Sequence, residues 1–174
     1  HDADGEPEGS YVEYLGVLCM ALLTRKPFCP YYVLNIADER VPFTGIIGMS
    51  SLVDTAETAG LHLTYLPKYV LSDDAALKRP DADVVAEFMA GFRRMFPDFP
   101  GSEIAGVHLN RAVKVQPLQV IGYSDRVQPP RTHNPDFYVV NTAQFASNTL
   151  NNNEVIRSVN AFLEQFEPEF RCAA

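Results

Sequence analysis

Cysteine is scarce in this chain of 174 residues, and its three thiols form no metal-binding or disulfide pattern. Cys19, Cys29 and Cys172 are odd in number, so they cannot all be paired, which favours a reducing compartment and predicts a cytoplasmic protein. No Cys-x-x-Cys pair is present and the four histidines are scattered along the chain. We therefore predict no zinc site and no other metal site.

Basic residues and long apolar runs are lacking as well. The 14 lysines and arginines are outnumbered by 22 aspartates and glutamates, which gives a net charge of −8. A protein that binds nucleic acid through its backbone needs basic surface, and so does one that binds an anionic membrane. The longest apolar run, residues 15–23, is far shorter than the about 20 residues that cross a bilayer. We therefore expect neither a nucleic-acid partner nor a membrane span.

What the chain does have is a globular composition, with 47% hydrophobic and 21% charged residues, and a pattern rich in strands. β-branched, aromatic and aliphatic residues predict strands over 11–24, 31–36, 44–53 and 62–70. The run LGVLCMALL inside the first of these also suits a buried helix. Pro67 should place the second half of the fourth strand at an edge or at its end.

The second half of the chain predicts two helices and further strands. Apolar residues at helical spacing predict helices over 81–96 and 152–166. Strands are expected within 103–122 and over 137–140, with a proline-rich loop at 123–136 between them. This order predicts an α+β fold: a mixed, mostly antiparallel sheet with helices on one face, followed by a C-terminal strand, loop and helix.

Sequence motifs for catalysis are missing, so candidate binding residues come from local context. There is no G-x-S-x-G nucleophile motif, phosphate loop or G-x-G-x-x-G fingerprint. The segment 137–156 leads from an apolar strand into a helix, and it could form an anion site or simply an asparagine-capped helix. Arg111 could hold an anion or serve the fold. The aromatic residues Tyr31, Tyr32, Phe43 and Tyr65 could wall a ligand cavity or form core.

Six segments in order resemble the flavin-containing amine oxidase superfamily, in particular its bacterial FAD-dependent oxidoreductases similar to protoporphyrinogen oxidase and phytoene desaturase. They are YLGVLCMALLTRKPFCPYYVLNIAD (14–38), PFTGIIGMSSLVD (42–54), HLTYLPKYVLSDD (62–74), MFPDFPGSEI (95–104), RAVKVQP (111–117) and FYVVNTAQ (137–144). The resemblance covers residues 11–166. It implies the substrate-binding portion of an enzyme that passes a hydride from an organic substrate, such as an amine, a porphyrinogen or a polyene, to FAD.

The resemblance also implies a division of the chain. Residues 1–10 would be a flexible end, 11–136 a substrate-binding domain, 137–167 a strand–loop–helix returning to the FAD domain, and 168–174 a tail. The N-terminal Rossmann part that grips FAD is not among these residues, so it would be the partner, and this chain alone would be inactive and would not bind FAD.

Site residues follow from the same resemblance. Those implied near the substrate are Tyr31, Tyr32, Met49, Tyr65 and Arg111. Those implied near the cofactor are Asn141, Thr142, Gln144 and Asn153. The family often has Glu-His where this chain has Gly48-Met49, which removes polar groups from the substrate face. Its loop acid and glycine are replaced by Asn148-Thr149 and Asn151.

Two other functions remain open: a stand-alone small-molecule-binding module, and a protein-interaction domain, neither of them catalytic. Without its Rossmann partner, the chain should show an unpaired strand edge or an apolar patch, through which we expect it to form a homodimer.

Overall fold

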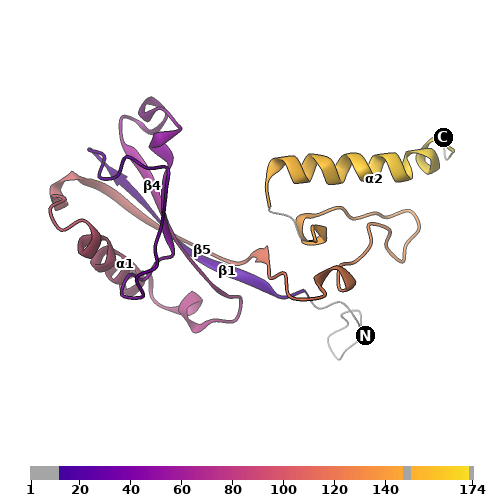
Figure 1. Cartoon of the computed structure of the whole chain (residues 1–174), viewed down its shortest axis with the longest axis horizontal. Coiled ribbons are helices and arrows are strands. Elements are labelled where there is room, and N and C mark those ends of the chain that lie inside the picture. Colours follow the sequence, from indigo (N-terminus) through magenta and orange to yellow (C-terminus); the bar gives the residue numbers. More distant parts are fainter. Residues whose placement is uncertain (1–11, 147–149, 173–174) are drawn as a thin grey trace. The chain divides into compact units, whose positions relative to one another are not determined.

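A computed structural model gives the structure of residues 12–146 and 150–172. The chain forms two compact units, of which the first is Tyr14–Val115 and the second contains the described residues 12–13, 116–146 and 150–172 (Figure 1). The N-terminal end predicted to be flexible, residues 1–10, lies outside the described residues.

The first unit is built on a five-stranded antiparallel sheet with the strand order β2-β3-β4-β1-β5. The strands are β1 (Tyr14–Thr24), β2 (Val33–Asn35), β3 (Gly45–Gly48), β4 (His62–Leu71) and β5 (Ile104–Pro117). With the helices described below, the sheet confirms the α+β fold predicted from the sequence.

The interior strand β1, which lies between β4 and β5, shows why its sequence forms a strand and not a buried helix. Leu18, Met20 and Leu22 are buried, while Cys19 and Ala21 between them are only half-buried. This period of two is the mark of a strand with two different faces. The helical alternative for LGVLCMALL is thus excluded, and the strand prediction for this segment is confirmed.

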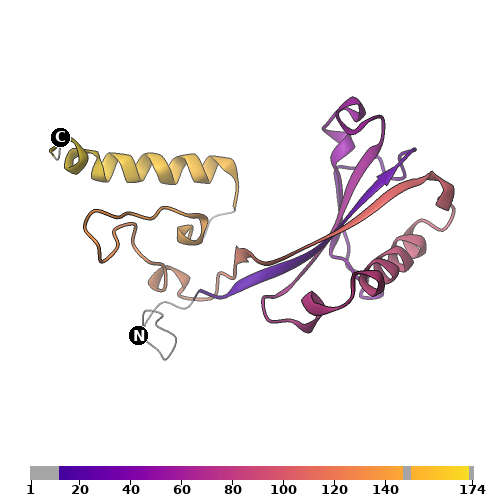
Figure 2. The ribbon, with the colours of Figure 1, turned by 180° about the vertical axis from the view of Figure 1, so that it is seen from behind.

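The helix α1 (Asp81–Met95) covers one face of the sheet, as Figures 1 and 2 show. β4 and β5 flank β1 and are both antiparallel to it, so they run parallel to each other and need a connection that crosses the sheet. The 3-10 helix η3 (Ala75–Lys78) and α1 make that crossing. The helix predicted at 81–96 is confirmed to within one residue.

The core lies between α1 and the inner face of the sheet. Val84, Phe88 and Phe92 of α1 are buried with side chains of β1, β3 and β4. Phe28, which follows β1, extends this core by edge contacts with Phe92 at 4.9 Å between ring centroids. Each fully buried large side chain contributes about 1.5–3 kcal/mol of hydrophobic free energy, so α1 and the sheet stabilise each other.

Pro67 lies where the pairing between β3 and β4 has ended. β3 pairs with Thr64 and Tyr65 of β4, but its ladder stops before Pro67, which has no N–H to donate. The carbonyl of Pro67 accepts instead from the backbone N–H of Thr44 at 2.8 Å. Beyond Pro67, β4 is paired with β1 alone, so its second half is a local edge of the sheet, as predicted.

Of two further predicted strands, one is confirmed only in part and the other is wrong. The strand expected over 44–53 ends at Gly48, and the 3-10 helix η1 (Met49–Ser51) follows it, because Gly48 is the last residue paired with β4. The strand expected over 137–140 is reduced to one isolated bridge between Arg131 and Tyr138. An apolar run forms a strand only when a neighbouring segment pairs with it. Among the described residues, the run 137–140 has no pairing beyond this single bridge.

The second unit holds the helix α2 (Asn152–Cys172), which continues beyond the predicted end at residue 166. Tyr138 packs on α2, with its ring centroid 5.6 Å from Phe162 and 5.1 Å from Phe166. The 3-10 helices η5 (Tyr123–Asp125) and η6 (Thr142–Gln144) are joined by a hydrogen bond of 2.5 Å from the Tyr123 hydroxyl to the carbonyl of Ala143. In the described parts of the chain, no helix has both the length and the apolarity needed to cross a bilayer.

Candidate functional site

Four of the predicted substrate residues are brought together at one end of β3. The backbone N–H of Gly48 donates to the carbonyl of Tyr32 at 2.7 Å, and a Cβ added at Gly48 would lie 2.9 Å from the carbonyl oxygen of Tyr31. Met49 follows Gly48 directly, and Tyr65 pairs with Ile47 across the ladder. Glycine at position 48 thus permits the close approach that gathers these residues.

The aromatic residues near this point differ in burial, which separates core from surface. Phe43 is 2% exposed and belongs to the core, whereas Tyr31 is 63% exposed and Tyr32 is also exposed. Tyr65 is half-buried. Tyr31, Tyr32 and Tyr65 are therefore accessible to a ligand and Phe43 is not.

Tyr65 belongs to a large apolar surface on the side of the sheet away from α1, called the open face below. Side chains alternate along a strand, so the residues between the buried ones of β1 and β4 point to this side. In the order of their cross-strand pairs these are Leu15 and Leu71, Val17 and Tyr69, Cys19 and Pro67, Ala21 and Tyr65, and Leu23 and Leu63. Of these ten side chains, only the Cys19 thiol could become charged near neutral pH, by losing its proton.

Burial raises the pKa of the Cys19 thiol above its usual value. The open face is therefore neutral along both strands at physiological pH. The other cysteine with described surroundings, Cys29, lies in the loop after β1 and lines a different depression together with His62 and Ser50.

Arg111, the fifth predicted substrate residue, lies elsewhere. Its Nη1 donates to the carbonyl of Leu77 at 3.0 Å and to that of Arg79 at 2.5 Å, and its Nη2 forms an ion pair with Asp81. These groups belong to η3 and the start of α1, so the side chain points to the covered face of the sheet. The structure does not bring Arg111 together with the four other residues, and it gives this arginine a role in holding the crossover.

A polar pair borders the open face on β5. Leu109 packs against the core and Arg111 points to α1, so alternation places His108 and Asn110 on the opposite side, the open face. His108 Nε2 and Asn110 Oδ1 are 3.2 Å apart, and both residues are exposed. A Cβ added at Gly106 would lie 3.6 Å from Cδ1 of Leu23, which places this part of β5 beside the apolar residues of β1.

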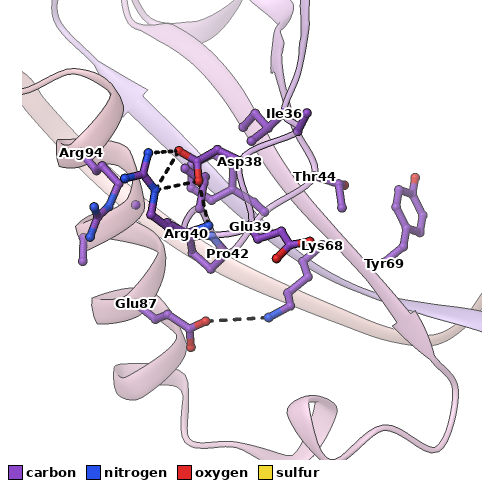
Figure 3. A pocket seen from close by; sticks show the side chains of 15 residues that line it. Ile36, Asp38, Glu39, Arg40, Pro42, Thr44, Lys68, Tyr69, Glu87 and Arg94 are labelled. Carbon is purple, nitrogen blue, oxygen red and sulfur yellow. Dashed lines mark hydrogen bonds and ion pairs between the residues drawn. The ribbon is translucent and has the colours of Figure 1, made fainter.

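A charged depression of about 570 Å³ lies on the covered side, between the loop 36–44, β4 and α1 (Figure 3). The Arg40 guanidinium donates to both carboxylate oxygens of Asp38, from Nε at 2.9 Å and from Nη2 at 2.7 Å. These hydrogen bonds lower the pKa of Asp38 to about 2. Lys68 is 3.7 Å from Glu87 of α1, and Figure 3 shows Tyr69 pointing away from this pair.

Sequence reasoning missed this depression because the run ADERVP (37–42) has the composition of a turn. The only signal was the close succession of Asp38, Glu39 and Arg40 before a proline. Cations and anions line the depression in equal number: Arg40, Lys68 and Arg94 against Asp38, Glu39 and Glu87. Because opposite charges already meet here, the depression has no excess of either sign to attract an ion.

Three of the predicted cofactor residues form the 3-10 turn η6 in the second unit. The Asn141 Oδ1 accepts from the N–H of Ala143 at 2.9 Å, and the Gln144 Oε1 accepts from the N–H of Asn141 at 2.8 Å. The Gln144 amide also donates to the carbonyls of Val139 and Gln128. Asn141 and Gln144 thus make a reciprocal capping box around η6, in which Thr142 is the first residue.

The start of α2 is an asparagine-capped helix end, which is one of the two interpretations that the sequence left open beside an anion site. The N–H of Glu154 donates to Asn151 Oδ1 at 3.0 Å, so asparagine caps this helix. Asn153, the fourth predicted cofactor residue, lies one turn before Arg157 on an exposed side of α2. Asn148 and Thr149 lie outside the described residues. In the described parts of the chain no three His, Cys, Asp or Glu side chains gather into a metal-binding group.

Comparison with known proteins adds no relative. No protein-family model matches the chain, and a search of curated proteins finds no significant match. Functional conclusions therefore depend on the chemistry of the open face, the charged depression and the second unit.

Proposed function

We propose that this chain is the substrate-binding portion of an FAD-dependent oxidoreductase of the flavin-containing amine oxidase type, and that the parent protein is cytoplasmic. The observation that carries the proposal is the backbone proximity of Tyr31, Tyr32 and Met49 to Gly48 at the end of β3, beside the ladder in which Ile47 pairs with Tyr65. An apolar wall with aromatic residues at its end binds and orients an organic substrate and excludes water.

In this proposal the chain does not bind flavin by itself. The Gln144 amide already donates to the carbonyls of Val139 and Gln128, and Asn141 Oδ1 already accepts from the N–H of Ala143, so these groups serve the fold of the second unit. In the proposed enzyme, FAD held by an N-terminal Rossmann part would accept the hydride. This chain contributes substrate binding and orientation, and on its own it is inactive.

An exposed apolar stripe on α2 supports the presence of such a covering part. Its members are Val155, Ile156, Val159 and Leu163, and Ile156 is 58% exposed. Apolar side chains gathered on one side of a helix are typical of a surface that another domain covers. We propose that the Rossmann part of the same protein packs here.

The first experiment is a visible absorbance spectrum of the full-length natural protein, recorded beside the 174-residue chain. A flavin band in the full-length protein alone supports the proposal. A band in neither sample, even after addition of FAD, contradicts it.

A pair of matched substitutions tests the covering surface in the same full-length protein. Ile156→Gln removes an apolar side chain from the stripe, whereas Glu164→Gln puts the same residue on the polar side of α2. We expect the first to weaken flavin retention at elevated temperature and the second to leave it unchanged. Equal retention in both variants would remove the support that the stripe gives.

A stand-alone binding module without catalysis is the alternative. It is favoured by the reciprocal capping box of Asn141 and Gln144, which gives both side chains a role in the fold. A third function, a protein-interaction domain, would use the same exposed surfaces for a homodimer. Sedimentation over a wide concentration range distinguishes these cases, because a chain that stays monomeric throughout has no such self-association.

A further inference from the structure

We propose that Cys29 is a site of covalent modification, at which its thiol adds to small uncharged α,β-unsaturated carbonyl compounds. The site is the depression of about 300 Å³ that Cys29 shares with His62 and Ser50, called the Cys29 depression below. The inference goes beyond the proposed function and does not depend on it, because no side chain of this depression is among those assigned to substrate or cofactor.

The Cys29 depression lies at the end of the hydrophobic core. Phe28 forms part of its wall and packs on Phe92 and Phe96, with 4.9 Å between ring centroids in each case. Ile46, another residue of the wall, is fully buried. Because the close-packed core holds these side chains in place, the depression has a fixed apolar wall.

The sequence around Cys29 restricts its backbone. Pro27 lies two residues before it and Pro30 directly after it, so one ring locks its own φ and the other keeps Cys29 in an extended conformation. The loop is anchored where it leaves β1, since the backbone N–H of Arg25 donates to the carbonyl of Glu103 at 2.8 Å. The half-buried thiol is thus presented by a segment with little conformational freedom.

Two polar side chains of β4 line the same depression. His62 and Thr64 are two residues apart on the strand, so both leave it on the same side. The cross-strand partner of Thr64 is Leu22, which is fully buried in the core. Both polar side chains therefore lie on the covered side of the sheet, at the border of the core.

The Thr64 hydroxyl points to a ligand for the depression. Thr64 is only 4% exposed, and among the described residues its hydroxyl makes no hydrogen bond. Thr24, also buried, differs in that its hydroxyl donates to the carbonyl of Lys26 at 2.8 Å. In the part of the chain that the structure describes, each side-chain oxygen or nitrogen sealed from solvent has a partner. The Thr64 hydroxyl is therefore open to the Cys29 depression, where it can donate to a bound molecule.

The lining residues decide the chemistry of that molecule. None of them is an aspartate, glutamate, lysine or arginine, so a charged compound would lose hydration without meeting an ion of opposite sign. The volume of about 300 Å³ is at the lower end of small-molecule sites, which selects a small compound. A thiol reacts as a nucleophile, and a carbon–carbon double bond conjugated to a carbonyl is an uncharged electrophile of this size.

The step is an addition, and it needs no oxidant, reductant or second substrate. Cys29 Sγ forms a bond to the β-carbon, and the π electrons of the conjugated system shift onto the carbonyl oxygen to give an enolate. A ring nitrogen of His62 takes the proton of the thiol and returns it to the α-carbon, so the product is a neutral thioether. The Thr64 hydroxyl donates to the enolate oxygen while that oxygen carries charge.

The rate of addition at Cys29 tests the proposal directly. The probe is crotonaldehyde, the protein is the whole 174-residue chain with Cys172→Ser, and peptide mass spectrometry follows each thiol, relative to mercaptoethanol in the same solution. We expect Cys29 to react about tenfold faster in the folded chain than in the urea-unfolded chain. Cys19 should react more slowly in the folded chain, since burial raises the pKa of its thiol. A folded-state rate at Cys29 no higher than the unfolded-state rate would overturn the proposal.

Two variants at one position separate stabilisation of the enolate from simple access. Thr64→Val removes the hydroxyl and keeps the shape of the side chain, whereas Thr64→Ser keeps the hydroxyl. Thr64→Val should slow addition of crotonaldehyde by about tenfold, and Thr64→Ser should restore most of the rate. Iodoacetamide reacts by displacement and forms no enolate, so neither variant should change its rate at Cys29. Equal slowing with both reagents would contradict the role of the hydroxyl.

A second pair of variants tests the proton acceptor. His62→Gln should slow addition at Cys29 by about tenfold or more, because no imidazole then takes the thiol proton. His133→Gln changes an exposed loop residue of the second unit and should leave the rate unchanged. Equal rates in the two variants would contradict the assignment of His62.

The charge selectivity of the depression is tested with two maleimides that share one reactive ring. N-ethylmaleimide is uncharged, whereas maleimidopropionic acid carries a carboxylate at neutral pH. With each rate taken relative to mercaptoethanol, Cys29 should prefer the uncharged reagent by about tenfold. The same preference should vanish in the urea-unfolded chain. A folded chain without this preference would show that the depression does not select neutral compounds, and it would overturn that part of the proposal.

Discussion

Pro42 packs directly against Gly91, so that the loop 36–44 touches the backbone of α1. A Cβ added at Gly91 would collide with Cδ of Pro42 and lie 3.1 Å from its Cγ. The proline ring is stiff, and Phe43 beside it is fully buried, so neither can move aside easily. This contact fixes the loop that carries Asp38 and Arg40.

Gly91→Ala should therefore destabilise the protein, although alanine is the better helix former by about 1 kcal/mol. We expect overpacking to outweigh this gain and to lower the free energy of unfolding by about 1–3 kcal/mol in urea denaturation. Gly101→Ala is the control, since a Cβ there meets nothing within 4 Å. Equal stability of the two variants would show that the loop adjusts.

The ion pair of Asp38 predicts a distinct titration. Its carboxyl should titrate near pH 2 in a carbon-detected NMR experiment, because Arg40 stabilises the charged form. A lowered pKa means that the contribution to stability is present above the ordinary aspartate value and is lost as the pH falls toward 2. Arg40→Gln should raise the pKa toward the ordinary range, although the backbone N–H of residue 40 would still donate to Asp38. A titration that stays near pH 2 in this variant would assign the shift to another group.

Arg111 predicts a change in stability. Arg111→Met removes its bonds to two backbone carbonyls and to Asp81, and it should lower the free energy of unfolding by about 1–3 kcal/mol in urea denaturation. Lys114→Met is the matched control on the same strand and should change stability little. Equal stability of the two variants would contradict the role of Arg111 in holding the crossover.

Phe162 and Leu163 are adjacent in α2, but their substitution should affect stability very differently. Phe162→Ala removes a ring that packs on Tyr138 and Phe166, so it should destabilise the second unit by about 3–5 kcal/mol and broaden its melting by circular dichroism. Leu163→Ala alters an exposed side chain and should leave the isolated chain within about 0.5 kcal/mol of the parent sequence. Similar losses in both variants would mean that Leu163 is covered in the isolated chain.

Much of the fold could be predicted because local periodicity agrees with the final packing. The helical spacing of Val84, Phe88 and Phe92 identifies α1 without knowledge of its neighbours. The segment LGVLCMALL is apolar throughout, so only its burial in the sheet shows the period of two that decides between strand and helix. The apolar run 137–140 could not be placed in the same way. Its state depends on a pairing partner, and a single bridge to Arg131 is all it has among the described residues.

The candidate site was only partly accessible to sequence reasoning. The sequence identified Tyr31, Tyr32 and Tyr65 as candidates because they are aromatic. Their proximity depends on the pairing of β3 with β4 and on the hydrogen bond from Gly48 to Tyr32, which the sequence does not reveal. Arg111 shows the opposite case, because the face to which a residue of β5 points depends on where the strand enters the sheet. His108 and Asn110 lie on the exposed side for the same reason, and no local pattern distinguishes them from a structural histidine and its neighbour.

The place of β1 between β4 and β5 has a consequence for synthesis on the ribosome. Of the five strands of this sheet, β1 is translated first, and both of its neighbours are translated later. Until Ile104–Pro117 has emerged, one edge of the nascent sheet is bare, and the sequence LGVLCMALL is without its full cover. The apolar strand β1 therefore stays exposed along this edge for the whole time needed to translate the crossover helix and β5.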